Sequence, residues 1–114
     1  MEYNGNIPIL NKEQFETLLL IYAAYVDYEF TEEEKSFILS RCSLETFETM
    51  HNLFLSLEDF SCLRIIINYK EKYYPTKKSQ DDLFKLLKEI FGVDGDYSRI
   101  EKVFVSFFKK IKHI

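Results

Sequence analysis

The sequence predicts an all-α fold, a compact bundle of about six helices that contains two related helix hairpins. Apolar residues recur at helical spacing rather than alternating as in a strand, glycine (3) and proline (2) are scarce, and a capping residue precedes each apolar run. The chain has 114 residues, of which 46% are hydrophobic, so it has the length of one domain with a core. We therefore expect a single helical domain over residues 1–114, with residues 1–10 as an N-terminal extension.

Six small polar residues mark the expected helix starts. A side chain at this position can accept a hydrogen bond from the backbone N–H of the third helical residue. The six residues are Asn11, Thr31, Ser43, Ser56, Ser79 and Ser98. In five cases the residue three positions later is an acid or amide, whose side chain can accept a hydrogen bond from the backbone N–H of the capping residue. These residues are Gln14, Glu34, Asp59, Asp82 and Glu101, whereas Ser43 has only Thr46.

The first helical segment, after Asn11, is apolar on all faces. One stripe consists of Phe15, Leu18, Leu19, Tyr22, Ala23 and Val26, and the other faces carry Leu20, Ile21, Ala24 and Tyr25. A helix that is apolar all round is buried, so we expect this helix at the centre. The extension before it carries Ile7, Pro8, Ile9 and Leu10, which could pack across the bundle or against a second subunit.

The second, third and fourth segments have shorter apolar stripes. They consist of Phe37 and Ile38, then Phe47, Met50, His51 and Phe54, then Leu63, Ile66 and Ile67. The fourth segment is expected to end near Lys70 and Lys72, ahead of Pro75, because basic side chains complement the helix dipole and proline stops a helix.

The fifth and sixth segments have one-sided stripes that complete the expected core. The residues are Leu83, Leu86, Leu87 and Ile90, then Ile100, Val103, Phe104, Phe107, Phe108 and Ile111. Lys77 and Lys78 would oppose the positive end of a helix dipole, so we expect the fifth helix to start at Ser79.

Charge and composition exclude several classes of partner. The net charge is −4 and the pI is about 5.2, which disfavours a nucleic-acid partner. The best basic and aromatic stretch, residues 69–78, is interpreted as a solvated helix end with its tyrosines folded over the core. The absence of an apolar run of 18 residues and of a secretory signal predicts no membrane span and a cytoplasmic location.

The sequence contains no catalytic motif, so we expect a protein that is not an enzyme and requires no cofactor. Cys42 and Cys62 are not in a Cys-x-x-Cys spacing and are interpreted as small buried hydrophobes. His51 shares the stripe of Met50 and Phe54, so it is interpreted as a hydrogen-bonded core histidine. The weakest alternative is a hydrolase with Cys42 as nucleophile or His51 as base.

An acidic motif occurs twice. Residues 26–35, VDYEFTEEEK, match residues 93–102, VDGDYSRIEK, at an offset of 67 residues, and apolar residues align on both sides. The repeated unit is therefore a helix pair, and two such pairs about a pseudo-twofold axis would bring both turns to one end of the molecule. The two copies supply the acids Asp27, Glu29 and Glu34, and Asp94, Asp96 and Glu101.

Each turn looks like the second half of an EF-hand loop, but the first half is missing. The first and third loop positions need oxygen ligands, and they hold Ile90 and Gly92 in one copy and Ala23 and Tyr25 in the other. A calcium EF-hand is therefore excluded. Two interpretations stay open: the acids only terminate and cap helices, or they converge on a divalent cation.

The two copies give the chain a resemblance to a known family. Residues 18–34, LLLIYAAYVDYEFTEEE, with residues 93–101, VDGDYSRIE, resemble the TerB-like family of tellurite-resistance and stress-response proteins, from about Asn11 to the end. The first turn departs from the family in having Tyr28 where the second has Gly95. The resemblance implies a helical bundle of two related halves whose paired acids hold a divalent metal. The implied positions are Asp27, Glu34, Asp94 and Glu101, with Glu29 and Asp96 as further candidates.

The expected function is that of a non-catalytic interaction or sensing module in a stress-related setting. Its partner would be another protein, which the sequence does not identify, and a homodimer is compatible with the sequence. The alternative is a divalent-metal-binding domain that uses the paired acidic turns.

Overall fold

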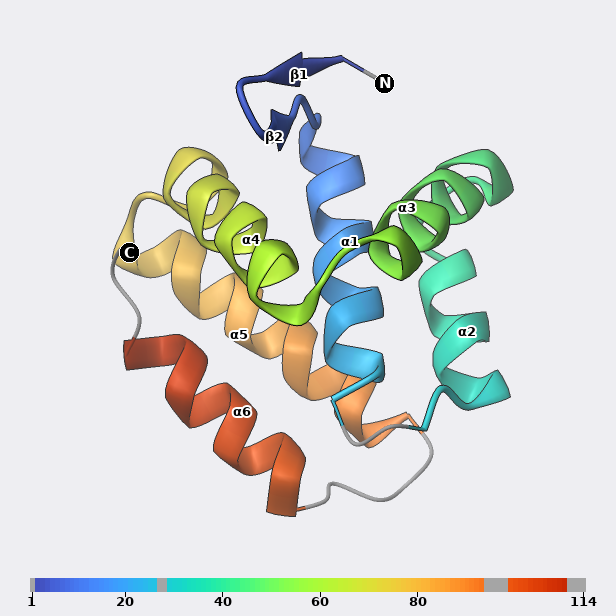
Figure 1. Cartoon of the computed structure of the whole chain (residues 1–114). Helices are drawn as coiled ribbons and strands as arrows, with labels where there is room; N and C mark the ends of the chain where they lie inside the picture. The colour runs from blue at the N-terminus through green and yellow to red at the C-terminus, as the bar shows by residue number, and fades with distance from the viewer. Residues whose placement is uncertain (1, 27–28, 94–98, 111–114) are drawn as a thin grey trace.

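The fold is built around its first helix. The computed structural model describes residues 2–26, 29–93 and 99–110 (Figure 1). These residues form two short strands, β1 (Tyr3–Asn4) and β2 (Ile7–Pro8), and six helices. The helices are α1 (Lys12–Ala24), α2 (Glu32–Leu39), α3 (Leu44–Ser56), α4 (Asp59–Tyr73), α5 (Lys77–Gly92) and α6 (Arg99–Lys110). The predicted all-α bundle of about six helices is confirmed.

Helix α1 is central, as its all-round apolar pattern predicted. It packs against α2, α3, α4 and α5. Figure 1 shows α2 and α3 on one side of α1, α4 and α5 on the other, and α6 on the outer side of α5. The buried residues of α1 are Phe15, Thr17, Leu18, Leu19, Leu20, Ile21, Ala23 and Ala24. Burying one large apolar side chain stabilises a fold by about 1.5–3 kcal/mol, so the buried side chains of α1 contribute substantially to the stability of the core.

Three of the predicted caps start their helices. Asn11 Oδ1 accepts a hydrogen bond of 2.7 Å from the backbone N–H of Gln14, whose side chain accepts one of 2.9 Å from the Asn11 N–H. Thr31 makes the corresponding pair with Glu34. Ser43 accepts a hydrogen bond of 3.1 Å from the N–H of Thr46. The starts of α1, α2 and α3 were therefore predicted correctly.

Two of the predicted caps are wrong. Ser56 ends α3 instead of starting α4, and its hydroxyl donates to the carbonyl of Leu53 inside the last turn. Helix α4 begins after Glu58, which makes no side-chain cap. Helix α5 begins at Lys77, two residues before the expected start at Ser79, because Thr76 and Ser79 cap each other reciprocally.

The early start of α5 has a physical reason. Lys77 and Lys78 lie in its first turn but are exposed, so water screens their repulsion from the helix dipole. A cap stabilises a helix by about 1 kcal/mol, which is enough to offset that repulsion. Ser98, the sixth expected cap, lies outside the described residues.

The N-terminal extension forms a short hairpin, which the sequence analysis did not predict. Tyr3 pairs with Pro8 and Asn4 with Ile7 in antiparallel register. Gly5 has a φ of 66°, a left-handed conformation that glycine adopts without steric cost, and this permits the tight turn. Strands of two residues are too short to give an alternating apolar pattern, which is why the sequence showed no strand signal.

The extension packs across the bundle on α4. The hydroxyl of Tyr69 donates to the carbonyl of Pro8 (2.6 Å) and accepts from the N–H of Leu10 (3.0 Å). The hydroxyl of Tyr73 donates to the carbonyl of Leu10 (2.7 Å). The tyrosines at the end of α4 therefore fold back over the core, as predicted, and they satisfy backbone groups of the extension.

Lys70 is not the solvated helix-end lysine that the sequence suggested. It is 5% exposed, and its Nζ donates a hydrogen bond of 3.2 Å to the carbonyl of Phe108 in the last turns of α6. The same Nζ lies 4.8 Å from the ring centroid of Phe108 and 5.8 Å from that of Phe84. Burial lowers the pKa of Lys70 from its usual value. Lys70 therefore connects α4 to the C-terminal part of α6 rather than serving only the end of its own helix.

We predict that Tyr69→Phe destabilises the protein by about 1–3 kcal/mol. The substitution keeps the ring but removes the hydroxyl, which leaves the N–H of Leu10 and the carbonyl of Pro8 without this partner in a buried position. Urea unfolding followed by circular dichroism measures the change. Tyr3→Phe is the matched control, because Tyr3 is 54% exposed. Equal stabilities for the two variants would contradict the anchoring role of Tyr69.

Candidate functional site

Three of the six predicted site acids, Glu29, Glu34 and Glu101, belong to the described residues. Glu34 and Glu101, at equivalent positions of the repeat, are both buried, whereas Glu29 is exposed. The carboxylate of Glu34 accepts hydrogen bonds from the N–H (2.8 Å) and the hydroxyl (3.1 Å) of Thr31. The capping interpretation is therefore confirmed for Glu34. The other three predicted acids, Asp27, Asp94 and Asp96, lie outside the described residues.

The helix ends that flank the two acidic turns gather at one end of the molecule. Figure 1 shows the ends of α1 and α5 and the starts of α2 and α6 in its lower part. Val93 at the end of α5 shares a shallow surface with Glu32, Glu33 and Phe37 of α2. This arrangement agrees with the expectation from the repeat. Within residues 2–26, 29–93 and 99–110, no three His, Cys, Asp or Glu side chains form a group that could hold a metal ion.

The two cysteines have the environments of weakly reactive thiols. Cys62 is buried, and burial, with the Asp59 charge as a smaller cause, raises the pKa of its thiol to about 12. Cys42 is half-buried, its thiol donates to the carbonyl of Ile38, and burial raises its pKa. Because the thiolate is the nucleophile, neither environment favours the hydrolase alternative.

His51 is hydrogen-bonded, as predicted, but half-buried rather than fully in the core. Its Nε2 and the hydroxyl of Tyr25 share a hydrogen bond of 2.8 Å. The imidazole packs among aromatic rings, with ring centroids 5.2 Å away in Phe47 and 5.6 Å away in Phe30. Burial, and secondarily the charge of Lys35, lowers the pKa of His51. This histidine is therefore neutral at pH 7 and positions Tyr25.

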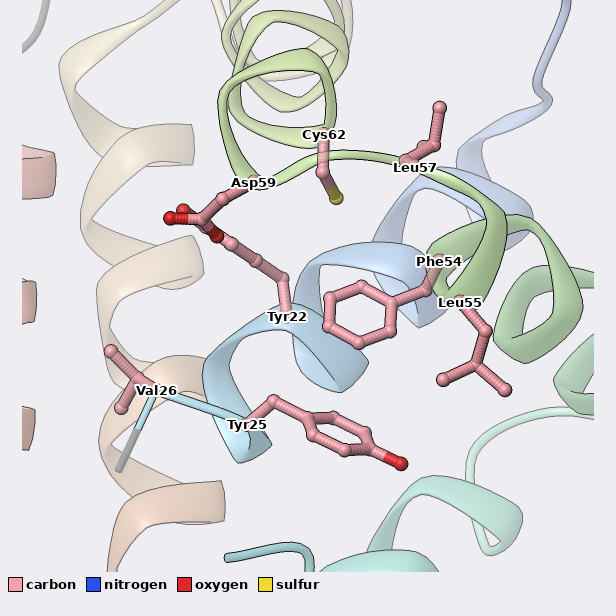
Figure 2. Close-up of a pocket in the computed structure, with 8 residues that line it drawn as sticks. All are labelled: Tyr22, Tyr25, Val26, Phe54, Leu55, Leu57, Asp59 and Cys62. Carbon is pink, nitrogen blue, oxygen red and sulfur yellow. The ribbon is translucent and has the colours of Figure 1, made fainter. Parts of the chain in front are cut away.

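A half-open cleft of about 450 Å³ lies where α1, α3 and α4 meet (Figure 2). This volume falls within the range of roughly 300–1,000 Å³ that is typical of ligand sites. Its lining residues are Tyr22, Tyr25, Val26, Phe54, Leu55, Leu57, Asp59 and Cys62. They come from the last turn of α1 and the two residues after it, the last turn of α3, the connection that follows and the first turn of α4.

The polar groups of the cleft gather at the start of α4. Figure 2 shows the side chains of Tyr22 and Asp59 extending toward each other, with Cys62 above them. Burial is the main cause that raises the pKa of Tyr22, and the nearby negative charge of Asp59 raises it further. Tyr22 is therefore a neutral donor, and Asp59 supplies the negative charge of the cleft.

The opposite part of the cleft is aromatic. The rings of Tyr25 and Phe54 lie with their centroids 4.8 Å apart. Tyr22 packs against Phe54 on one side (6.3 Å) and against Phe104 of α6 on the other (5.8 Å). The hydrogen bond from Tyr25 to His51 fixes the orientation of the Tyr25 ring. The cleft thus combines rigid aromatic surfaces with one carboxylate.

Exposed apolar side chains border the cleft at the α3–α4 corner. Leu55, which lines the cleft, is 61% exposed, and so is Phe60, which follows Asp59 in the first turn of α4. Exposed large apolar side chains beside a concave surface mark an interaction site. We refer to the eight lining residues as the α1/α3/α4 cleft, and to Leu55 and Phe60 as its apolar border.

Sequence reasoning did not find this cleft. Its lining residues are spread from position 22 to position 62, and only the packing of α1, α3 and α4 brings them together. The sequence pattern gives Asp59 only as a partner of the expected cap at Ser56. One available signal was the apolar run of Tyr22, Tyr25 and Val26, which continues past the end of α1 at Ala24.

Comparisons of the chain with protein-family models, with curated proteins and with solved structures found no match. The resemblance to TerB-like proteins therefore stays a prediction. None of the helices in the described part of the chain has the length and apolar character needed to cross a membrane.

We predict that His51 makes stability depend on pH below neutrality. Its pKa is lower in the folded state than the ordinary value of 6.5, so the unfolded chain binds more protons as the pH falls. Stability from the neutral imidazole is fully present above pH 6.5 and decreases below it. The melting temperature should fall more between pH 7.5 and pH 5.5 for the wild type than for His51→Gln. Identical drops, or an imidazole that titrates at or above 6.5 by NMR, would contradict this prediction.

Proposed function

We propose that this protein is a non-catalytic interaction module that docks a partner protein on the α1/α3/α4 cleft and its apolar border. The observation that carries the proposal is the combination of a half-open aromatic cleft with two exposed apolar side chains at its edge. Interfaces are enriched in Tyr and Phe at their centre, and anchor residues of a partner insert into such pockets.

The chemistry of the cleft supports binding rather than catalysis. The polar groups that line it are a carboxylate, two phenols and a thiol whose pKa is raised to about 12. Tyr22 has a raised pKa as well, so it acts as a hydrogen-bond donor and not as a base. A rigid apolar surface with a few fixed polar groups is suited to recognition.

The wider role that we propose follows the resemblance to TerB-like proteins. In that setting the chain would act in the cytoplasm as an interaction or sensing module of a stress response. The burial of α1 and the arrangement of the helix ends that flank the repeated turns are compatible with two related helix pairs.

We predict that a photo-crosslinking amino acid at position 55 captures a partner protein in the cells that express this chain. The same amino acid at position 44 is the matched control, because Leu44 is 60% exposed and lies at the opposite end of α3. Crosslinked adducts are counted and identified by gel electrophoresis and mass spectrometry. The expected result is a discrete adduct at position 55 that is absent at position 44. The same adducts at both positions, or none at either, would contradict docking at the cleft.

A second candidate function is divalent-cation binding by the acidic turns. The observation that favours it is the burial of Glu34 and Glu101 at equivalent positions of the repeat. Each glutamate is the third residue of the helix that follows its acidic turn, and hard cations need several converging oxygens. With Asp27 and Asp94, these glutamates would supply the oxygen ligands that calcium, magnesium or manganese prefer.

For this candidate we predict a rise in the melting temperature on addition of the cation. A ligand at one hundred times its dissociation constant stabilises a protein by about 2.7 kcal/mol, which raises the midpoint of a domain of this size by about 10 °C or more. Melting in chelator is compared with melting in millimolar calcium, magnesium, manganese or zinc. Glu101→Gln should remove the rise. A midpoint that stays within about a degree in every metal would exclude this function.

A further inference from the structure

We propose that the occupant of the α1/α3/α4 cleft is a partner segment that inserts apolar side chains and carries one lysine or arginine, whose cation pairs with Asp59. This inference rests on the proposed function and deepens it by naming the chemistry of the partner.

The charge of the cleft selects a cation. Among the lining residues that the structure describes, Asp59 is the charged one, and the other polar groups are the hydroxyls of Tyr22 and Tyr25 and the thiol of Cys62. A carboxylate offers about four lone-pair positions to hydrogen-bond donors. Asp59 is exposed at the cleft, so a guanidinium or ammonium group can reach these positions.

The surroundings of Asp59 add to this preference. Glu58 precedes it and is exposed, and the whole chain has a net charge of −4. Opposite charge on a partner increases the association rate and excludes acidic competitors. A partner segment with a carboxylate at the same place would meet like charge instead, and it would bind poorly.

The walls of the cleft suit both parts of such a segment. Tyr22, Tyr25 and Phe54 present aromatic rings, which attract cations over their faces and pack against aliphatic side chains. The long methylene stem of lysine or arginine would lie along these rings while its charged end reaches Asp59. Apolar neighbours in the segment would contact Leu55 and Leu57.

The shape of the cleft favours a chain segment over an enclosed small molecule. Small-molecule sites bury most of the ligand surface, whereas this cleft is half-open and its lining residue Leu55 is 61% exposed at the surface. A segment that crosses the cleft can bury its anchor residues inside and cover the apolar border with their neighbours. This matches the docking of a helix or extended peptide into an apolar groove.

The test begins with a selection of random peptides displayed on phage against the wild-type chain. We expect the enriched peptides to share apolar residues and one lysine or arginine at a constant spacing from them. The best peptide is then synthesised with lysine, with norleucine and with glutamate at the basic position. Binding is measured by fluorescence anisotropy, and the bound site is identified from shifts of the methyl NMR signals of Val26, Leu55 and Leu57.

The variant that tests the charge pairing is Asp59→Asn, which keeps the size of the side chain and removes its charge. We expect this substitution to weaken binding of the lysine peptide at least tenfold and to change the affinity for the norleucine peptide by less than a factor of two. Asp82→Asn is the matched control, because Asp82 is also exposed but lies in α5, outside the lining of the cleft. Circular dichroism and thermal melting establish that both variants fold.

The outcomes separate this inference from the proposed function. A basic residue in the enriched peptides, with loss of affinity in Asp59→Asn and not in Asp82→Asn, supports the inference. Apolar peptides that shift the cleft methyl signals without any basic preference overturn it and leave the proposed function standing. Failure to enrich any peptide that shifts these signals overturns both.

A second copy of the chain is the competing occupant. Sedimentation at increasing concentration would then show a dimer in the wild type that Leu55→Glu dissociates, and this result would overturn the inference of a basic partner segment. We expect no self-association through the cleft, because the lining residues of a second copy's cleft include no lysine or arginine that could pair with Asp59.

Discussion

The burial of α1 is the constraint on which the rest of the structure depends. This helix is apolar on every face, so the other elements have to surround it, and α2, α3, α4 and α5 all contact it (Figure 1). The cover is complete along most of its length and becomes partial at its end, where Tyr22, Tyr25 and Val26 are only half-buried. The cleft lies at this end (Figure 2). The candidate binding site is therefore a direct consequence of how the core is covered.

Polar side chains connect the elements that surround this apolar helix. Tyr69 and Tyr73 bind the N-terminal extension, Lys70 binds a carbonyl of α6, and His51 binds Tyr25 at the edge of the cleft. Every buried side-chain nitrogen and oxygen in the described part of the chain has a hydrogen-bond partner. Since an unpartnered buried polar group costs about 1–3 kcal/mol, these contacts fix the relative positions of the helices, and with them the shape of the cleft.

Local and periodic signals predicted the architecture, whereas contacts between distant residues were out of reach. The apolar pattern of α1 predicted its central position, and Asn11, Thr31 and Ser43 marked helix starts correctly. Ser56 and Ser79 were predicted wrongly as helix starts, because each forms its hydrogen bonds within a turn other than the expected one. The spacing of residues along the chain does not decide between the two turns. The cleft and the burial of Lys70 depend on packing between helices far apart in the chain. The acids of the repeat were predicted from spacing alone; Glu34 and Glu101 are buried, and Asp27, Asp94 and Asp96 lie outside the described residues.

Native-state hydrogen exchange, read residue by residue, tests the central position of α1 most directly. If α1 organises the fold, the amides from Phe15 to Ala24 exchange only through global unfolding, and their opening free energies equal the free energy of unfolding measured with denaturant. Amides of the N-terminal extension and of the first turn of α4, at the border of the cleft, should open at lower free energy. Exchange of the α1 amides at a lower free energy than those of α4 or α5 would contradict the account.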